Sequence, residues 1–211
     1  MADLLIDTQG PPAAPAAGKG LLYFDSVSKQ LTYKNDTGRA YSAPGIKNYN
    51  TADVVASAAN TYLTGSLLDV PPHLLQVGAI FKWRLFMTKT AAGVAAPVWT
   101  IVVGINGTTA DTIRNTFTGT AQTAAVDTAF VEITAILRNI GAAGVLAGGL
   151  VLQKSAVTAA GFTNTVGGLV LINTSAGFDT TAASLKVGIC VNPGASGVWT
   201  HQIVKSEVLN L

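Results

Sequence analysis

The chain has 211 residues, of which 49% are hydrophobic and only 11% are charged, with a formal net charge of +2. A typical soluble domain carries about 25% charged residues. This composition excludes a disordered chain, which needs low hydrophobicity and high charge, and a heptad coiled coil. The net charge is also too small for binding nucleic acid through phosphate contacts. A chain that buries much surface against copies of itself needs few charges, so we expect self-association.

The first 50 residues differ from the rest of the chain. Residues 9–18 are rich in Pro, Ala and Gly, which predicts an extended connecting arm. Two strand-like runs follow at 20–25 and 30–34, and the polar turn between them predicts a β-hairpin. A lone two-stranded hairpin is marginally stable in water. We therefore expect it to rest on the main domain, on another copy or on a partner protein.

From residue 51 onward, short apolar runs alternate with turn signals such as Asn106-Gly107. The runs that predict strands are 79–87, 98–105, 113–118, 130–138, 145–153, 169–173, 185–191 and 198–211. No stretch shows sustained helical periodicity. This pattern predicts an all-β fold, a jelly-roll β-sandwich preceded by the extended arm and the short hairpin.

Alternation along these runs predicts which side chains face outward. Phe81, Trp83, Leu85 and Met87 share one face of their run, so Arg84 lies on the other face. Glu132 and Arg138 fall on the outward face of 130–138 in the same way. In a chain with so few charges, we interpret Arg84, Glu132 and Arg138 as candidate trimer-interface residues, with Glu132 as the ion-pair partner. The alternative is an ordinary solvated face.

The sequence contains no pattern typical of a catalytic, cofactor or metal site. His73 and His201 are far apart, and Cys190, the single cysteine, lies in a strand-like run that predicts a buried residue. No nucleotide-binding or hydrolase motif occurs. Most acidic residues adjoin turns, as expected for turn capping by Asp36, Asp111, Asp127 and Asp179. We therefore predict no enzyme activity, no cofactor and no metal. The alternatives are a glycan-active enzyme and an ion held on the threefold axis of a trimer.

The aromatic and apolar residues give two further expectations. The three tryptophans lie in strand-like runs beside other apolar residues, which predicts core positions; the alternative is a sugar-stacking surface formed by Trp83, Trp99 and Trp199. No run approaches the roughly 20 apolar residues of a membrane-spanning helix. The N-terminus also lacks the basic and apolar regions of a secretory signal. We expect no membrane partner and no export.

Several stretches resemble virion proteins of tailed bacteriophages. Residues 18–25 and 29–38 resemble a hairpin that links an N-terminal peptide to a distal domain in such proteins. Similarity to jelly-roll domains of the tumour-necrosis-factor-like type is found at 77–84, 87–93, 121–127 and 191–196. The resemblance implies a homotrimer that is made in the host cytoplasm and located on the capsid exterior of the virion. It implies a capsid decoration, cement or head-fibre protein whose partners are itself and the major capsid protein.

The alternative function is a tail-fibre, spike or baseplate component that binds a host-surface glycan. In either case we expect residues 1–50 to attach to the virion and 51–211 to trimerise. Residues 1–47 carry nine charged side chains, whereas 155–178 carry none. The candidate capsid-binding residues are Leu4, Leu5, Ile6, Leu22, Tyr23, Phe24, Tyr33, Lys34 and Arg39.

Overall fold

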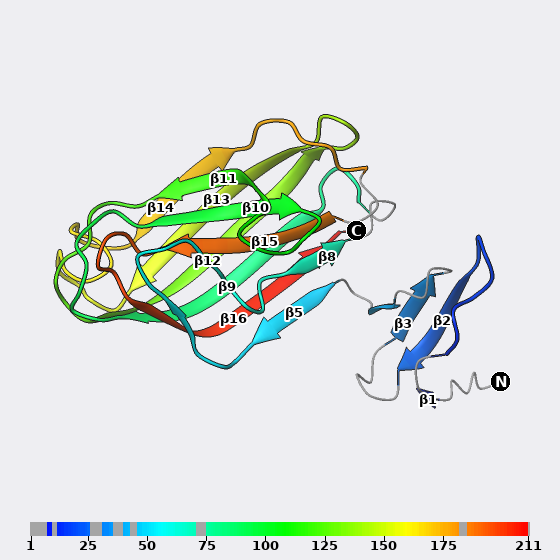
Figure 1. Ribbon diagram of the computed structural model, residues 1–211, viewed down its shortest axis with the longest axis horizontal. Helices are drawn as coiled ribbons and strands as arrows, with labels where there is room; N and C mark the ends of the chain where they lie inside the picture. The colour runs from blue at the N-terminus through cyan, green and yellow to red at the C-terminus, as the bar shows by residue number, and fades with distance from the viewer. Residues whose placement is uncertain are drawn as a thin grey trace, which may run out of the picture. The chain divides into compact units, whose positions relative to one another are not determined.

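The computed structural model describes residues 8–9, 12–25, 31–35, 40–42, 46–70, 75–181 and 185–210. The chain divides into two compact units, Met1–Ile46 and Lys47–Leu211, just before the boundary predicted at residue 50. Lys47–Asn50 belongs to the second unit because it pairs with that unit's C-terminal strand. Among the described residues every regular element is a β-strand and none is a helix, which confirms the all-β prediction (Figure 1).

The first unit is a four-stranded sheet in the order β1-β2-β3-β4. The strands are β1 Thr8–Gln9, β2 Gly20–Asp25, β3 Leu31–Asn35 and β4 Ala40–Ser42. β2 and β3 pair antiparallel, which confirms the predicted hairpin. β1 adds parallel to β2, and β4 adds antiparallel to β3. Since three or more strands are needed for independent stability, the flanking strands provide support that the hairpin alone lacks.

The second unit contains two sheets whose described strand pairs are all antiparallel. The seven-stranded sheet has the order β14-β13-β12-β9-β16-β5, with β6 also paired to β16. The five-stranded sheet has the order β11-β10-β15-β7, with β8 also paired to β15. The strands are β5 Lys47–Asn50, β6 Val54–Ala56, β7 Thr61–Tyr62, β8 Leu68–Val70, β9 Ile80–Lys89, β10 Val98–Gly104, β11 Thr112–Thr118, β12 Asp127–Asn139, β13 Val145–Lys154, β14 Leu169–Thr174, β15 Leu185–Asn192 and β16 Trp199–Leu209. All eight strands predicted in this segment are present, as β9 to β16.

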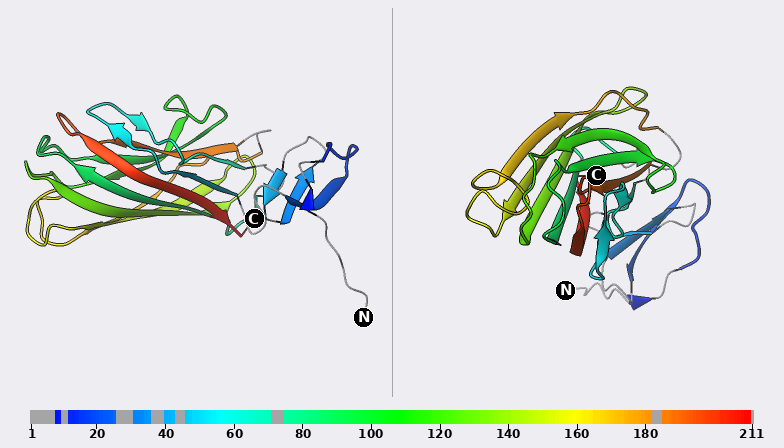
Figure 2. Two further views of the ribbon diagram at one scale, coloured as in Figure 1. Left: turned by 90° about the horizontal axis from the view of Figure 1, so that it is seen from below. Right: turned by 60° about the vertical axis from the view of Figure 1, so that its left-hand side comes forward.

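The core of the second unit lies between these two layers, in a β-sandwich-like arrangement (Figure 2). Trp99 on β10 packs against Trp199 on β16 with ring centroids 5.1 Å apart, so an aromatic contact joins the two sheets. Trp83 is also fully buried, and its Nε1 donates a hydrogen bond to the carbonyl of Ser66 at 2.8 Å. The indole Nε1 of Trp199 donates to the Gln122 side chain at 3.0 Å. The core prediction is therefore confirmed for all three tryptophans, and the alternative of a tryptophan sugar platform is wrong.

Three charged side chains hold the loops at one end of this unit. Lys89 is buried, and its Nζ donates to four backbone carbonyl oxygens at 2.8–3.4 Å. The Nζ of Lys154 donates to four carbonyls of the loop after β13 at 2.8–3.3 Å. Asp127 accepts from the backbone N–H groups of residues 128, 156 and 162. Hydrogen bonds that involve an ionised group are roughly twice as strong as neutral ones, so these three residues fix the loop conformations.

Turn capping by aspartate is confirmed at the described positions. Besides Asp127, Asp111 accepts hydrogen bonds from the backbone N–H groups of residues 106, 107 and 108. Asp179 accepts from the N–H and the hydroxyl of Thr181. Asp36 lies outside the described residues. Cys190 is buried as predicted, and burial raises the pKa of its thiol to about 11.

His201 is a buried titratable group on β16. Its Nδ1 lies 3.3 Å from the carbonyl oxygen of Val54, which accepts the Nδ1 proton of the neutral ring. Its Nε2 is buried and has no hydrogen-bond partner within the described part of the chain. Burial lowers the pKa of His201 to about 4, and the hydrogen bond to Val54 raises it by less. The ring is therefore neutral at pH 7.

We predict that His201 makes the fold acid-sensitive. Between its ordinary pKa of about 6.5 and its folded pKa of about 4, the unfolded chain binds a proton that the folded chain does not. The free energy of unfolding therefore falls as the pH falls through this window, by up to about 3 kcal/mol. Urea unfolding of wild type and His201→Gln across this range measures the effect, since the carboxylates contribute equally to both. Equal pH slopes in the two proteins would contradict the assignment.

Candidate interaction surface

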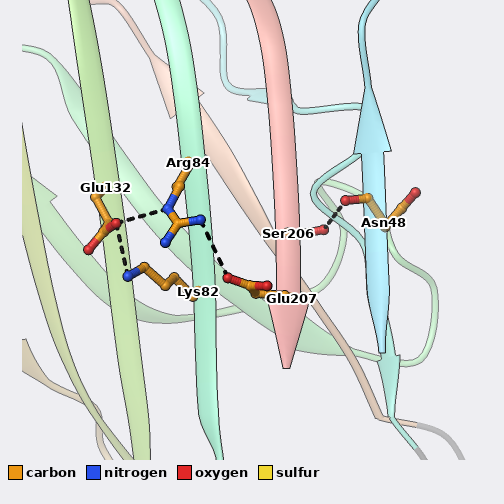
Figure 3. A network of polar contacts seen from close by, with 6 residues as sticks. All are labelled: Asn48, Lys82, Arg84, Glu132, Ser206 and Glu207. Carbon is orange, nitrogen blue, oxygen red and sulfur yellow. Dashed lines mark hydrogen bonds and ion pairs between the residues drawn. The ribbon is translucent and has the colours of Figure 1, made fainter. Parts of the chain in front are cut away.

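The outward face of the seven-stranded sheet carries a network of four charged side chains drawn from three adjacent strands (Figure 3). Arg84 on β9 lies directly opposite Glu132 on β12, and its Nε is 3.1 Å from Oε2 of that carboxylate. The Nζ of Lys82 lies 3.0 Å from the same oxygen. The Nη1 of Arg84 also lies 3.7 Å from Oε1 of Glu207 on β16. Two cations and two anions thus form a cluster with no net charge.

Glu132 is the centre of this network. Burial raises the pKa of its carboxyl, but the hydrogen bonds and charges of Lys82 and Arg84 together outweigh that effect, so its pKa lies below the ordinary value. It therefore stays ionised at neutral pH. Like charges on neighbouring positions of a sheet repel one another. The carboxylate that Lys82 and Arg84 share offsets this repulsion.

An uncharged apolar strip lies on the same face, toward β14. Its exposed side chains are Ile136, Val151, Val170 and Ile172, with exposed fractions of 42%, 40%, 67% and 84%. The register places them together, because Val151 lies between Glu132 and Val170, and Gly149 lies opposite Ile172. We call these four side chains the β12–β14 strip. Exposed apolar groups clustered in this way mark interaction sites more often than isolated ones do.

The structure brings two of the three predicted interface residues together. Arg84 and Glu132 form the expected ion pair, but within one chain. Arg138 is exposed near the end of β12, where the pairing with β13 shifts by one residue and leaves it unpaired in the ladder. Sequence reasoning missed Lys82 and Glu207 as members of the network. It also missed the β12–β14 strip, although the outward positions of the alternating runs and the uncharged stretch 155–178 pointed to it.

The first unit presents a smaller apolar face of its own. Leu22 and Tyr33 lie directly opposite each other on β2 and β3, with exposed fractions of 61% and 38%. The Tyr33 ring lies over Gly20, so a Cβ at that position would push the ring aside. Of the candidate capsid-binding residues, this pair is the most accessible that the structure describes.

The other candidates of the first unit are placed differently. Tyr23 faces the opposite side of β2 and is buried, so it stabilises the unit instead of offering a contact. Lys34 is half-buried, and its Nζ donates a hydrogen bond to the carbonyl of Pro12 in the arm. Phe24 is placed on β2 by its backbone. The remaining candidates lie outside the described residues: Leu4, Leu5, Ile6 and Arg39.

Comparison with known proteins adds no family to this description, because the chain matches no protein-family model and no curated protein. Among the described residues, no group of three or more His, Cys, Asp or Glu side chains is placed to hold a metal ion. No helix in that part of the chain is long and apolar enough to cross a membrane.

We predict that Glu132→Gln destabilises the fold by about 1 kcal/mol at low salt, because it leaves the two neighbouring cations without their shared anion. The loss should shrink as sodium chloride is added, since salt screens the repulsion. Arg138→Gln is the matched control: Arg138 makes no ion pair within the described residues, so we expect a change below about 0.5 kcal/mol. Chemical unfolding at low and high salt measures both. A salt-independent loss in Glu132→Gln would contradict the electrostatic account.

Proposed function

We propose that the protein is a structural component of a tailed-phage virion. In this proposal it is a homotrimer that binds and stabilises the capsid exterior as a decoration, cement or head-fibre protein. The second unit is then a jelly roll of the tumour-necrosis-factor-like type. The observation that carries the proposal is the β12–β14 strip, a cluster of exposed apolar side chains on the seven-stranded sheet. The sequence resemblance supplies the virion context.

The charges around the strip favour a second copy of the chain as its occupant. The strip is uncharged, and the network beside it is internally neutral. A nucleic acid or a strongly acidic or basic protein would find no opposite charge on the strip itself. The exposed cations Arg138 and Lys205 of the same sheet lie outside it, near the end of β12 and on β16. Identical copies can therefore cover the strip without burying a charge. Oligomer interfaces are also more apolar than ordinary protein surface, and this strip fits that composition.

The first unit supplies the attachment function in this proposal. It has its own sheet and its own exposed apolar pair, Leu22 and Tyr33. Eight of the nine charged side chains of residues 1–47 also lie in this unit. A trimer would present three such units at once. Several weak sites that engage adjoining capsid subunits together give a much higher overall affinity than one site alone. Stabilisation of the shell follows from bridging its subunits.

We predict that Ile172→Lys converts the trimer into a folded monomer. Ile172 is 84% exposed, so the substitution does not disturb the core, but a lysine ammonium buried in a contact between copies is strongly unfavourable. Ile113→Lys is the matched control, since Ile113 is a half-exposed isoleucine on β11 of the other sheet. Light scattering after size exclusion gives the mass of each variant. If Ile172→Lys keeps the mass of wild type, the strip is not the interface.

We also predict that Leu22→Asp weakens capsid binding while leaving the trimer intact, because it places a charge in the exposed apolar pair of the first unit. Val55→Asp is the control, as Val55 is exposed to a similar extent on β6 of the second unit. Cosedimentation with capsids stripped of this protein measures the binding. The expected loss is at least about tenfold for Leu22→Asp, which is typical of a central interface residue. Equal binding by both variants would show that this pair does not mediate attachment.

A further inference from the structure

A pocket opens on the outward face of the seven-stranded sheet, at the end nearest the loops held by Lys89 and Lys154. It has a volume of about 210 Å³. It is lined by Phe86, Met87, Thr128, Ala129, Phe130, Gln153, Ser155 and Gln202. Pockets for drug-sized ligands measure about 300–1,000 Å³. This one is therefore suited to a single small ring.

Two phenylalanine rings give the pocket an apolar wall. Phe86 on β9 and Phe130 on β12 are directly opposite in the ladder, with ring centroids 5.0 Å apart and planes inclined by 53°. Phe86 is 47% exposed, which is unusual for a side chain of that size on a packed sheet. The negative faces of such rings attract groups that carry partial positive charge, including polarised C–H groups.

Two amides and two hydroxyls surround the rings. Gln153 and Gln202 are exposed, and neither side-chain amide is hydrogen-bonded to another described residue. Gln202 is the extra residue of a bulge in β16, between His201 and Ile203, and bulges re-aim side chains out of the regular strand pattern. An amide offers both donors and acceptors, as do the hydroxyls of Thr128 and Ser155. Each of these groups can therefore pair with an alcohol, which also both donates and accepts hydrogen bonds.

The pocket lining contains no charged side chain. Asp127 and Lys154, which adjoin lining residues in the chain, are engaged with backbone N–H and carbonyl groups of the loops. Arg84 and Glu132 lie two residues from Phe86 and Phe130 on the same face, and they are paired with each other. A charged ligand would therefore lose hydration without gaining an unpaired opposite charge from the lining. A purely apolar ligand would strip water from the two amides without replacing their hydrogen bonds. A ring with C–H groups on its face and hydroxyls at its edge satisfies both parts of the lining.

We propose that this pocket binds a neutral sugar ring, which lies against Phe86 and Phe130 while its hydroxyls contact Gln153 and Gln202. This inference goes beyond the proposed structural function and does not depend on it, because the pocket lies within a single chain. The pocket is formed by β9, β12, β13 and β16, whereas the most exposed residues of the β12–β14 strip lie on β14. Self-association through β14 and sugar binding at this pocket therefore use different parts of the sheet.

The test is saturation-transfer NMR on the full-length chain with glucose, galactose, mannose and N-acetylglucosamine as probes. We expect at least one of them to bind, with a Kd of about 1 mM, as suits a small open pocket. Phe86→Ala should weaken that binding at least about fivefold, and Phe86→Tyr should retain it because the ring remains. Tyr49→Ala is the matched control: Tyr49 is an aromatic residue 73% exposed on β5 of the same sheet, outside the pocket.

Gln202→Ala keeps the test decisive if Phe86→Ala fails to fold, because Gln202 is exposed and its removal leaves the core intact. It too should weaken binding, while Tyr49→Ala should not. Glucuronic acid, a charged sugar, should bind no better than glucose. The proposal is overturned if none of the four neutral sugars binds, if Gln202→Ala binds as tightly as wild type, or if the charged sugar is preferred.

Discussion

The strict alternation of side chains along β9 and β12 is the constraint on which the rest of this structure depends. Successive residues of a strand point to opposite faces, so a single register decides both the core and the surface. On β9, Phe81, Trp83 and Leu85 enter the core while Lys82, Arg84 and Phe86 face outward. A slip of one residue would bury the charges and expose the tryptophan. The register that places the core residues therefore also places the residues of the candidate interaction surface.

Most of the charged side chains named above are engaged with loop backbone or with one another. Lys89, Lys154 and Asp127 are engaged with loop backbone, and the four residues of the network centred on Glu132 neutralise one another on the sheet. What remains on the outward face near β14 is apolar and uncharged. In a chain with 11% charged residues, this arrangement leaves an uncharged sheet face on which the proposed self-association depends. It also leaves the pocket beside Phe86 lined only by neutral groups.

Sequence reasoning predicted β9 to β16 because alternation, or a continuous apolar run, over five or more residues is visible without any structure. It could not predict β5 to β8, since two to four residues cannot show a period and these strands exist only through their pairing with β15 and β16. An ion pair of Arg84 with Glu132 was expected between subunits, whereas the register of β9 and β12 forms it within one chain. Glu207 was not expected, because its place beside β9 depends on register. The positions of Arg138 and Gln202 at bulges are equally invisible in sequence. Phe86 and Phe130 are far apart in the chain, so their pairing becomes apparent only once β9 and β12 are aligned.

Sedimentation equilibrium of the unaltered full-length chain tests the central claim most directly, because it asks whether the uncharged outward face is covered by other copies. The account predicts a single species with three times the mass of the chain across the micromolar concentration range. A mass of one chain over the same range would contradict it.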